Sequence, residues 1–372
     1  MSSTPAVYLD HGATSFPKAP GVAAAVASFL DQEAGNPGRG GHRLTVAASR
    51  AIEAAREEAA ALLGGDPERT LFGSGATFWL NAVLASRLRP GDRVVTSALE
   101  HNAVMRPLRH LEESRGVEVA VVEAAHADGI PTAEEIAVRV SEAPTRLVVL
   151  THACNVSGAV VPVQEAAHAV APVPVVVDAR ALGIAALTCS GHKGLLGPSG
   201  IGLLLLAPGF DIEPLLRGGT GSRSESEEMP EFLPDRLEGG TPNGPGAVGV
   251  GAACRWLRER TVEAVAEHQR ALLRRAADGL RSISGVRLHG WADDQPHVAL
   301  LSFTLDGADS GELATWLDRE RGIMLRAGLH CAPAAHRRLG TFPDGTLRAG
   351  IGPFNTEQDI DALVDALRDA AV

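Results

Sequence analysis

The run Leu147-Val148-Val149-Leu150 is one of four short apolar stretches that decide the fold of this 372-residue chain. The other three are VVT at residues 94–96, VAVV at residues 119–122 and VVV at residues 175–177, and polar or helix-forming segments separate all four. Uninterrupted apolar runs of this length, rich in β-branched residues, are typical of parallel strands that helices cover on both faces. The pattern therefore predicts an α/β fold with a mostly parallel, doubly wound sheet.

The pattern changes after residue 254 and predicts a second, smaller α+β unit. The elements expected there are a long helix over residues 261–283, a strand over 298–303, a helix over 310–320, a strand over 345–349, and a last helix opened by the capping sequence TEQD at 356–359. We predict a large domain over residues 15–254, with residues 1–14 and 255–372 forming the small domain. The stretch 217–251 is rich in Gly, Pro, Ser and Glu, which predicts a long functional or mobile loop.

Composition argues against several classes of function. The net charge is −11 and the chain has no basic run, so neither nucleic acid nor an anionic membrane is an expected partner. The first ten residues lack the charged and apolar segments of a secretion signal, and no apolar stretch approaches the ~20 residues that span a bilayer. The four cysteines (Cys154, Cys189, Cys254 and Cys331) form no C-x-x-C pair and are expected to be reduced thiols. We therefore expect a cytoplasmic globular enzyme.

Lys193 is the first candidate catalytic residue. It lies in the run Ser190-Gly191-His192-Lys193-Gly194, fifteen positions after Asp178, which closes the apolar run 175–177. Small residues flank it, whereas a surface lysine usually lies among other charges. A lysine amine forms Schiff bases with carbonyl groups, and a strand-ending carboxylate can pair with a pyridinium nitrogen. This combination predicts pyridoxal phosphate as the cofactor.

Several small and polar residues could hold the phosphate group of that cofactor. The sequence GSGAT at residues 73–77 precedes a predicted helix, and a helix N-terminus offers unpaired N–H groups and a positive dipole end. Thr77 could add its hydroxyl, and Ser190 and His192 could supply further donors beside Lys193. The alternative is an ordinary turn in which Ser or Thr caps the helix.

Three other residues could contact the cofactor ring or the substrate. His101 follows the strand-like run at 94–96, where an imidazole could stack on a planar ring and move protons, although a structural histidine is the alternative. Asn155 follows the run at 147–150 and could bond the ring oxygen, or it could simply shape a turn. Arg348 lies in a predicted strand and is suited to clamp a substrate carboxylate.

Cys331 is the candidate nucleophilic thiol. It lies between Gly328 and Pro333, which predicts a mobile loop, and Arg326 and His330 are close enough in sequence to favour its thiolate. The other three cysteines have small or apolar neighbours and are expected to pack as small hydrophobic residues. A zinc site at His330, Cys331 and His336 would have too few ligands at the wrong spacing.

Together these motifs resemble the cysteine desulfurase branch of the class V aminotransferase family of pyridoxal-phosphate enzymes. The matching motifs are YLDHGAT at 8–14, NPGRGGH at 36–42, SALEHN at 97–102, SGHK at 190–193, GGTGS at 218–222, GGTPN at 239–243, RAGLHCAP at 326–333 and FNT at 354–356. The resemblance implies a fold-type I homodimer with active sites at the subunit interface. It also implies that L-cysteine is converted into L-alanine while the sulfur passes to Cys331 as a persulfide, and then to a sulfur-acceptor protein or another acceptor.

The resemblance implies a role for each site residue. Lys193 would form the Schiff base, Asp178 would pair with the pyridine nitrogen, and His101 would stack on the ring. The phosphate would be held by Ala76, Thr77, Ser190 and His192, with Thr220 from the other subunit. The substrate carboxylate would bind to Asn155 and Arg348.

The sequence also departs from the family pattern. The family usually has Asp-Ala-Ala-Gln where this chain reads Asp178-Ala179-Arg180, and the segment up to Lys193 is roughly ten residues shorter. Phe78 replaces the family Glu, and His11 replaces the family Asn. The missing Gln removes one hydrogen bond worth ~1 kcal/mol, so cofactor binding should survive. The alternatives are a pyridoxal-phosphate C–S β-lyase that releases pyruvate and ammonia, a catalytically inactive homologue acting as a binding subunit, and, third among enzymes, an aminotransferase.

Overall fold

The computed structural model describes the whole chain except residues 1–5, 39, 127, 172–174, 178–182 and 372. Its strands are β1 (Val7–Tyr8), β2 (Thr70–Gly73), β3 (Arg93–Ser97), β4 (Glu118–Val122), β5 (Leu147–Leu150), β6 (Val175–Val177), β7 (Ala186–Ser190), β8 (Gly202–Leu206), β9 (Val286–His289), β10 (Leu300–Leu305), β11 (Ile323–Met324), β12 (Arg326–Gly328) and β13 (Thr346–Gly350). Its α-helices are α1 (Val22–Ser28), α2 (Arg43–Leu63), α3 (Ala76–Arg87), α4 (Asn102–Arg115), α5 (Ala133–Ser141), α6 (Val163–Val170), α7 (Gly244–Arg260), α8 (Val262–Arg281), α9 (Ser310–Arg321), α10 (Pro333–Arg338) and α11 (Glu357–Ala370).

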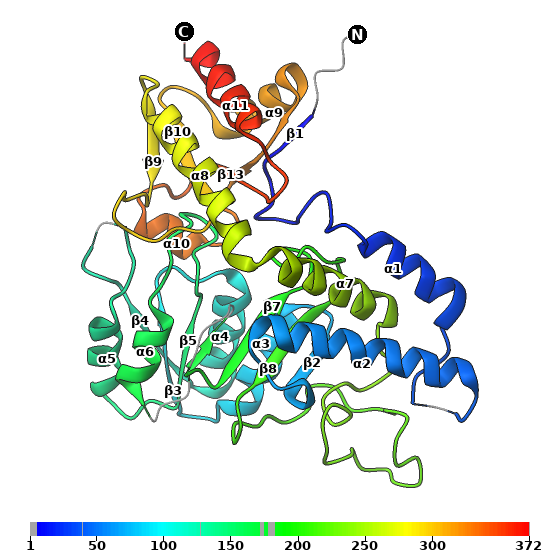
Figure 1. Cartoon of the computed structure of the whole chain (residues 1–372). Coiled ribbons are helices and arrows are strands. Elements are labelled where there is room, and N and C mark those ends of the chain that lie inside the picture. Colours follow the sequence, from blue (N-terminus) through cyan, green and yellow to red (C-terminus); the bar gives the residue numbers. More distant parts are fainter. Residues whose placement is uncertain (1–5, 39, 127, 172–174, 178–182, 372) are drawn as a thin grey trace.

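A seven-stranded sheet forms the centre of the larger unit (Figure 1). Its strand order is β2-β8-β7-β6-β5-β3-β4, and the predicted runs form the four neighbours β6, β5, β3 and β4, all parallel. Only β8 runs against its two neighbours. The prediction of a mostly parallel sheet is therefore confirmed.

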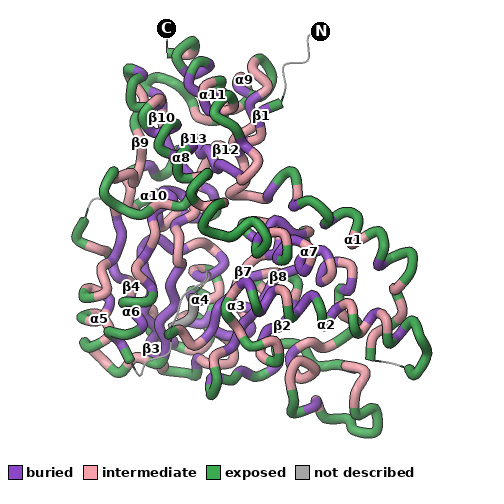
Figure 2. Tube along the Cα trace, viewed as in Figure 1, coloured by how far each residue is buried: buried purple, intermediate pink, exposed green. Residues whose placement is uncertain are grey.

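Alternate residues of the central strands belong to different hydrophobic clusters. Leu147 and Val149 of β5 pack in a cluster with α3 and α4, whereas Val148 and Leu150 pack with α5 and α6. Successive side chains of a strand point to opposite faces, so a strand covered on both sides is apolar at every position. Figure 2 shows these buried strands between helices whose outer surfaces are exposed.

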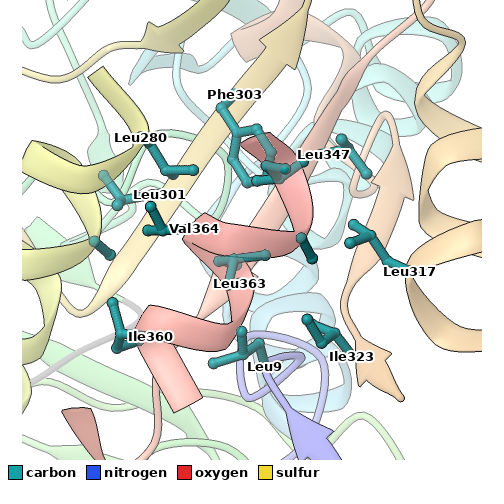
Figure 3. Packing of buried hydrophobic residues seen from close by; sticks show 14 of the residues in the cluster. Leu9, Leu280, Leu301, Phe303, Leu317, Ile323, Leu347, Ile360, Leu363 and Val364 are labelled. Carbon is teal, nitrogen blue, oxygen red and sulfur yellow. The ribbon is translucent and has the colours of Figure 1, made fainter. Parts of the chain in front are cut away.

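The smaller unit is built on the four-stranded antiparallel sheet β12-β13-β10-β9. Helix α11 begins with the predicted capping box, in which Thr356 and Asp359 bond each other's backbone N–H groups. Figure 3 shows side chains of this helix packing with α8, β10 and β13 around Phe303. The N-terminal segment joins the same unit, because β1 pairs with β11. The predicted boundary after residue 254 falls inside α7, and the division into domains stays a prediction.

Helix α7 corrects one expectation, because the stretch 217–251 is not a loop throughout. The helix begins at Gly244, where the Asn243 side chain accepts a hydrogen bond from the backbone N–H of Gly246. Its glycines allow close helix packing: a Cβ at Gly251 would lie 2.6 Å from the Cβ of Ala55 on α2. Among the described residues, no helix has both the length and the apolar character needed to cross a lipid bilayer.

Candidate active site

The candidate site lies where several strands of the large sheet end. The carboxyl ends of parallel strands meet at one edge of a sheet, which is where α/β proteins bind ligands. A cavity of about 450 Å³ lies there, and the small unit closes its other side with Val298, Leu300 and Ile351. Six predicted site residues line this cavity: Ala76, Thr77, His101, Asn155, Ser190 and Lys193.

The N-terminus of α3 has the features of a phosphate site. Gly75, its N-cap residue, has φ +148° and provides no side-chain cap, so the alternative of a Ser- or Thr-capped turn does not apply. The first N–H groups of α3 are therefore available to an anion. Ala76, Thr77 and Ser190 also line a second hollow, of about 680 Å³, together with His192. These residues fit the phosphate group expected from the sequence.

His101 is a neutral imidazole at the N-terminus of α4. Its Nδ1 accepts a hydrogen bond from the backbone N–H of Ala103 at 2.9 Å, so the ring proton is on Nε2. Burial, reinforced by the charge of Lys193, lowers the pKa of His101 to about 4. The residue therefore caps a helix, as a structural histidine would, and it also lines the cavity, where a cofactor-stacking residue was expected.

Lys193 is half-buried in a tight turn that follows β7. The carbonyl of Lys193 accepts the N–H of Leu196 at 2.9 Å, and the carbonyl of Gly191 accepts the N–H of Gly197 at 2.8 Å. From the N-terminal segment, the N–H of Ser15 donates to the His192 carbonyl at 2.8 Å. The backbone around the amine is thus held on two sides.

Arg348 lies directly behind the cavity and is not one of its lining residues. Its side chain is 2% exposed; Nη1 donates to the Asn155 carbonyl at 2.9 Å and Nη2 to Asp10 Oδ1 at 3.0 Å. A Cβ on Gly12, which lines the cavity, would lie only 2.9 Å from the guanidinium, so glycine at this position leaves room for Arg348. Nε of Arg348 and Oδ1 of Asn155 are buried and have no partner among the described residues. Unused hydrogen-bonding capacity therefore collects where the carboxylate site was predicted.

Cys331 is exposed on a short loop, and hydrogen bonds anchor this loop; the mobility expected of it stays a prediction. Only residues 329–332 separate β12 from α10. Asn155 Nδ2 donates to the His330 carbonyl at 2.6 Å, and the Asn102 N–H donates to the Cys331 carbonyl at 2.8 Å. Both His330 and Cys331 have left-handed backbones, with φ of 48° and 58°, so these bonds hold a conformation that non-glycine residues rarely adopt. Cys331 does not line the cavity that contains Lys193.

The expected electrostatic support from His330 is wrong. Burial lowers the pKa of His330 to about 3, and its Nε2 contacts the carbonyl of Thr346 at 3.1 Å. A neutral buried imidazole does not provide the positive charge expected beside the thiol. Of the nearby cations, the guanidinium of Arg348 has an electrostatic interaction with Cys331.

The remaining predicted site residues are Asp178 and Thr220. Asp178, the expected partner of the pyridine nitrogen, lies outside the described residues. Thr220 lines a separate hollow formed by residues 213–236. Its expected contribution to the site of a second subunit stays a prediction.

The prediction of site residues missed several cavity-lining residues. His11 and Gly12 follow β1, and Gln269 reaches the site from α8, where its Nε2 donates to the Ile351 carbonyl at 2.7 Å. Burial lowers the pKa of His11 to about 4. The motif YLDHGAT was a usable signal for the first two residues, but nothing in the helical pattern of α8 distinguishes Gln269 from a surface residue.

Comparison with known proteins agrees with this geometry. The aminotransferase class-V family matches residues 7–363. The chain is 33% identical to a probable cysteine desulfurase of Methanothermobacter thermautotrophicus, over 98% of this chain and 94% of the relative. It is 32% identical to the cysteine desulfurase CsdA of Escherichia coli, over 97% and 93% of the two chains. The apo structure of a cysteine desulfurase from Thermococcus onnurineus superposes with a TM-score of 0.92 at 27% identity, covering 98% of this chain and 94% of the other.

Proposed function

This chain belongs to the class V aminotransferase family, and we propose that it is a pyridoxal-phosphate-dependent cysteine desulfurase. The reaction would convert L-cysteine into L-alanine and leave the sulfur on Cys331 as a persulfide. Relatives named cysteine desulfurase match nearly the whole chain, which supports this activity over others in the family.

One observation carries the proposal: the cavity that contains Lys193 is linked directly to the segment that bears the exposed thiol. Asn155 lines the cavity and holds the His330 carbonyl at 2.6 Å. Helix α4, which begins next to His101, holds the Cys331 carbonyl at 2.8 Å. A C–S lyase requires no protein thiol, so this link favours the desulfurase.

The residues behind the cavity would bind and orient the substrate. Arg348 and Asn155 are suited to the carboxylate of cysteine, because a guanidinium pairs with a carboxylate through two N–H groups. Nη1 and Nη2 each keep one N–H that is not used for the bonds to Asn155 and Asp10. Binding there would aim the side chain of the substrate toward Lys193 and the Cys331 segment.

Pyridoxal phosphate, when bound, supplies an electron sink for bonds at Cα and Cβ of an amino acid. The Lys193 amine would remove the Cα proton and later return a proton, as a general base and acid. The Cys331 thiolate would attack the substrate sulfur: an S–S bond forms, the C–S bond breaks, and its electron pair stays on Cβ. Protonation of Cβ completes the methyl group of alanine, and Cys331 keeps the persulfide.

The same proposal includes a homodimer, a sulfur acceptor and a cytoplasmic location. Thr220 lies outside the cavity of its own chain, so a second copy would have to supply it. Large exposed apolar side chains occur close to that segment, at Leu215 and Leu216. A persulfide on an exposed cysteine is accessible to a sulfur-acceptor protein that docks at the site. Reduced thiols are the rule in the cytoplasm.

Incubation with L-cysteine and analysis of the products tests the proposal. Alanine should accumulate, and the Cys331→Ser variant should keep the cofactor absorbance but lose alanine formation. Borohydride should attach pyridoxal phosphate covalently to Lys193, and Lys193→Ala should abolish that adduct. Pyruvate and ammonia in place of alanine would support the lyase, and a protein without cofactor absorbance would support the inactive binding subunit.

A further inference from the structure

Two exposed arginines without a counter-charge lie near the segment that carries Cys331. Arg326 is in β12, five positions before the cysteine, and Arg106 is in α4. Neither side chain forms an ion pair or a hydrogen bond within the part of the chain that the structure describes. Exposed arginines elsewhere, such as Arg275 and Arg281, pair with carboxylates. The two cations near Cys331 are therefore available to a partner outside the chain.

Helix α4 brings Arg106 close to the Cys331 segment. The N–H of Asn102, the first residue of α4, donates to the Cys331 carbonyl at 2.8 Å. Arg106 follows Asn102 by four positions, and residues four apart lie on one face of a helix, about one turn (~5.4 Å) from each other along its axis. Arg106 is therefore one helical turn away from the residue that holds Cys331.

The small sheet holds Arg326 opposite a second arginine. In the antiparallel pair of β12 and β13, Arg326 lies directly across from Arg348. Side chains that lie opposite each other in such a pair share one face of the sheet, and like charges there repel each other. Asp10 balances the charge of Arg348 at 3.0 Å, whereas Arg326 has no carboxylate partner among the described residues. A charge that is kept at a costly position and left unpaired is typical of a functional surface.

The electrostatics of the site also bring the two arginines together. Burial is the largest cause of the lowered pKa of His101, and four positive charges add to it: Lys193, Arg348, Arg106 and Arg326. The chain as a whole carries a net charge of −11, so this region has the opposite sign to the rest of the molecule. An acidic partner would be repelled by most of the surface and attracted here, which would orient it.

The open shape of this surface favours a protein over a small molecule as the partner. Cys331, Arg106 and Arg326 are all exposed. None of them lines the cavity that contains Lys193 or the hollow at the phosphate site. Small ligands bind in clefts that enclose most of their surface, whereas a protein can cover an open surface.

We infer that Arg106 and Arg326 form a docking surface for the sulfur acceptor, and that this acceptor is a protein with carboxylates around its accepting thiol. The inference rests on the proposed desulfurase function. In the transfer, the acceptor thiolate attacks the outer sulfur of the Cys331 persulfide. A new S–S bond forms, the old S–S bond breaks, and its electron pair leaves with the Cys331 thiolate. The outer sulfur keeps its proton, so no further reactant is needed.

Two alkylating reagents measure the potential at Cys331 without requiring turnover. Iodoacetate is anionic and iodoacetamide is neutral, so the ratio of their rates at Cys331 reports the local potential, and the thiolate fraction cancels. Arg106→Met and Arg326→Met should each lower this ratio about two- to fivefold at low salt, as expected for one exposed charge pair. An ionic strength of about 1 M, where the screening length is ~3 Å, should lower the ratio in the unmodified protein.

Arg274→Met is the matched control, because Arg274 is an exposed arginine of α8 and is not among the charges that act on His101. It should leave the ratio of the two rates unchanged. A ratio that stays the same in both Arg106→Met and Arg326→Met would overturn the inference.

Sulfur transfer from the loaded enzyme tests the class of acceptor. Two peptides serve as acceptors: in one, glutamates flank a single cysteine, and in the other, glutamines replace these glutamates. The rate with the glutamate peptide relative to the glutamine peptide should fall about two- to fivefold in Arg106→Met and in Arg326→Met, but not in Arg274→Met. Equal effects of the variants on both peptides would overturn the inference. Failure of the unmodified enzyme to form a persulfide from L-cysteine would instead overturn the proposed function.

Discussion

The backbone N–H of Asn102 is a selective point at which to loosen the Cys331 segment. It donates to the Cys331 carbonyl at 2.8 Å, and Asn102 is not among the residues that line the cavity. Asn102 is the first residue of α4, where proline is well tolerated. His101 before it is already extended (φ −72°, ψ 155°), as a residue that precedes proline should be. Asn102→Pro therefore removes one donor and keeps the helix.

The size of the effect follows from that single bond. Its loss corresponds to about 1 kcal/mol, or a roughly fivefold shift in the opening equilibrium of the segment. Proline at a compatible position stabilises the folded protein by ~0.4–1 kcal/mol, because it restricts the unfolded chain. This gain offsets the lost hydrogen bond, so the global free energy of unfolding should barely change. The readout must therefore be local. The N–H of Ala332, which donates to the Leu329 carbonyl at 2.8 Å, should exchange with deuterium about fivefold faster.

Hydrogen exchange followed by mass spectrometry of peptides covering residues 329–332 measures this effect. Asn102→Ala is the matched control, since it removes the same side chain and retains the backbone N–H. With L-cysteine, the proline variant should also form the Cys331 persulfide more slowly than the alanine variant, at equal cofactor absorbance. Equal exchange rates in the two variants would refute the claim that Asn102 anchors the segment.

Three other predictions follow from burial and packing. Cys331 is exposed, whereas burial raises the pKa of the Cys254 thiol to about 12. Iodoacetamide near neutral pH should therefore label Cys331 long before Cys254. Equal labelling rates in peptide mapping would contradict this prediction. Burial lowers the pKa of His330 to about 3, below the ~6.5 of an unfolded chain. The unfolded state therefore binds more protons between these values, and stability should fall by up to about 1.4 kcal/mol per pH unit from this residue as the pH drops through that window. Urea titrations at several pH values check this, and His330→Asn should make the curve flatter. Gly251→Ala should destabilise the protein by about 1–3 kcal/mol, because its Cβ would lie 2.6 Å from an atom of α2, whereas Gly41→Ala, with nothing within 4 Å, should have little effect in the same denaturation assay.

The fold could be predicted where local pattern and burial agree. The strands β3 to β6 are apolar at successive positions because both faces of the sheet are covered, and this is visible in the sequence. Helix α7 was missed for the opposite reason. Its glycines suggest a loop locally, yet they are present because α2, about 200 residues earlier in the chain, packs too closely for side chains.

The site could be predicted where strand ends position a side chain. His101, Asn155 and Lys193 each follow a strand of one parallel sheet, so the sheet edge brings them together. The pair Asp10–Arg348 could not be predicted, because it joins residues that are 338 positions apart and meet only where Asp10 bridges to Gly350 beside β13. The hydrogen bond from Lys18 to the His192 carbonyl likewise joins the N-terminal segment to the turn after β7.

Asn155 connects Arg348 with the segment that carries Cys331, through its backbone on one side and its side chain on the other. Its backbone carbonyl accepts a hydrogen bond from Arg348 Nη1 at 2.9 Å. Its side-chain Nδ2 donates to the carbonyl of His330, the residue before Cys331, at 2.6 Å. The Nδ2 group has two hydrogens and one is used for the His330 carbonyl, so the other is available to a ligand in the cavity. The left-handed backbone at His330 and Cys331 is costly and depends on such bonds. Under the proposed function, Asn155 would thus contact the substrate with one hydrogen of Nδ2 and hold the segment that carries Cys331 with the other.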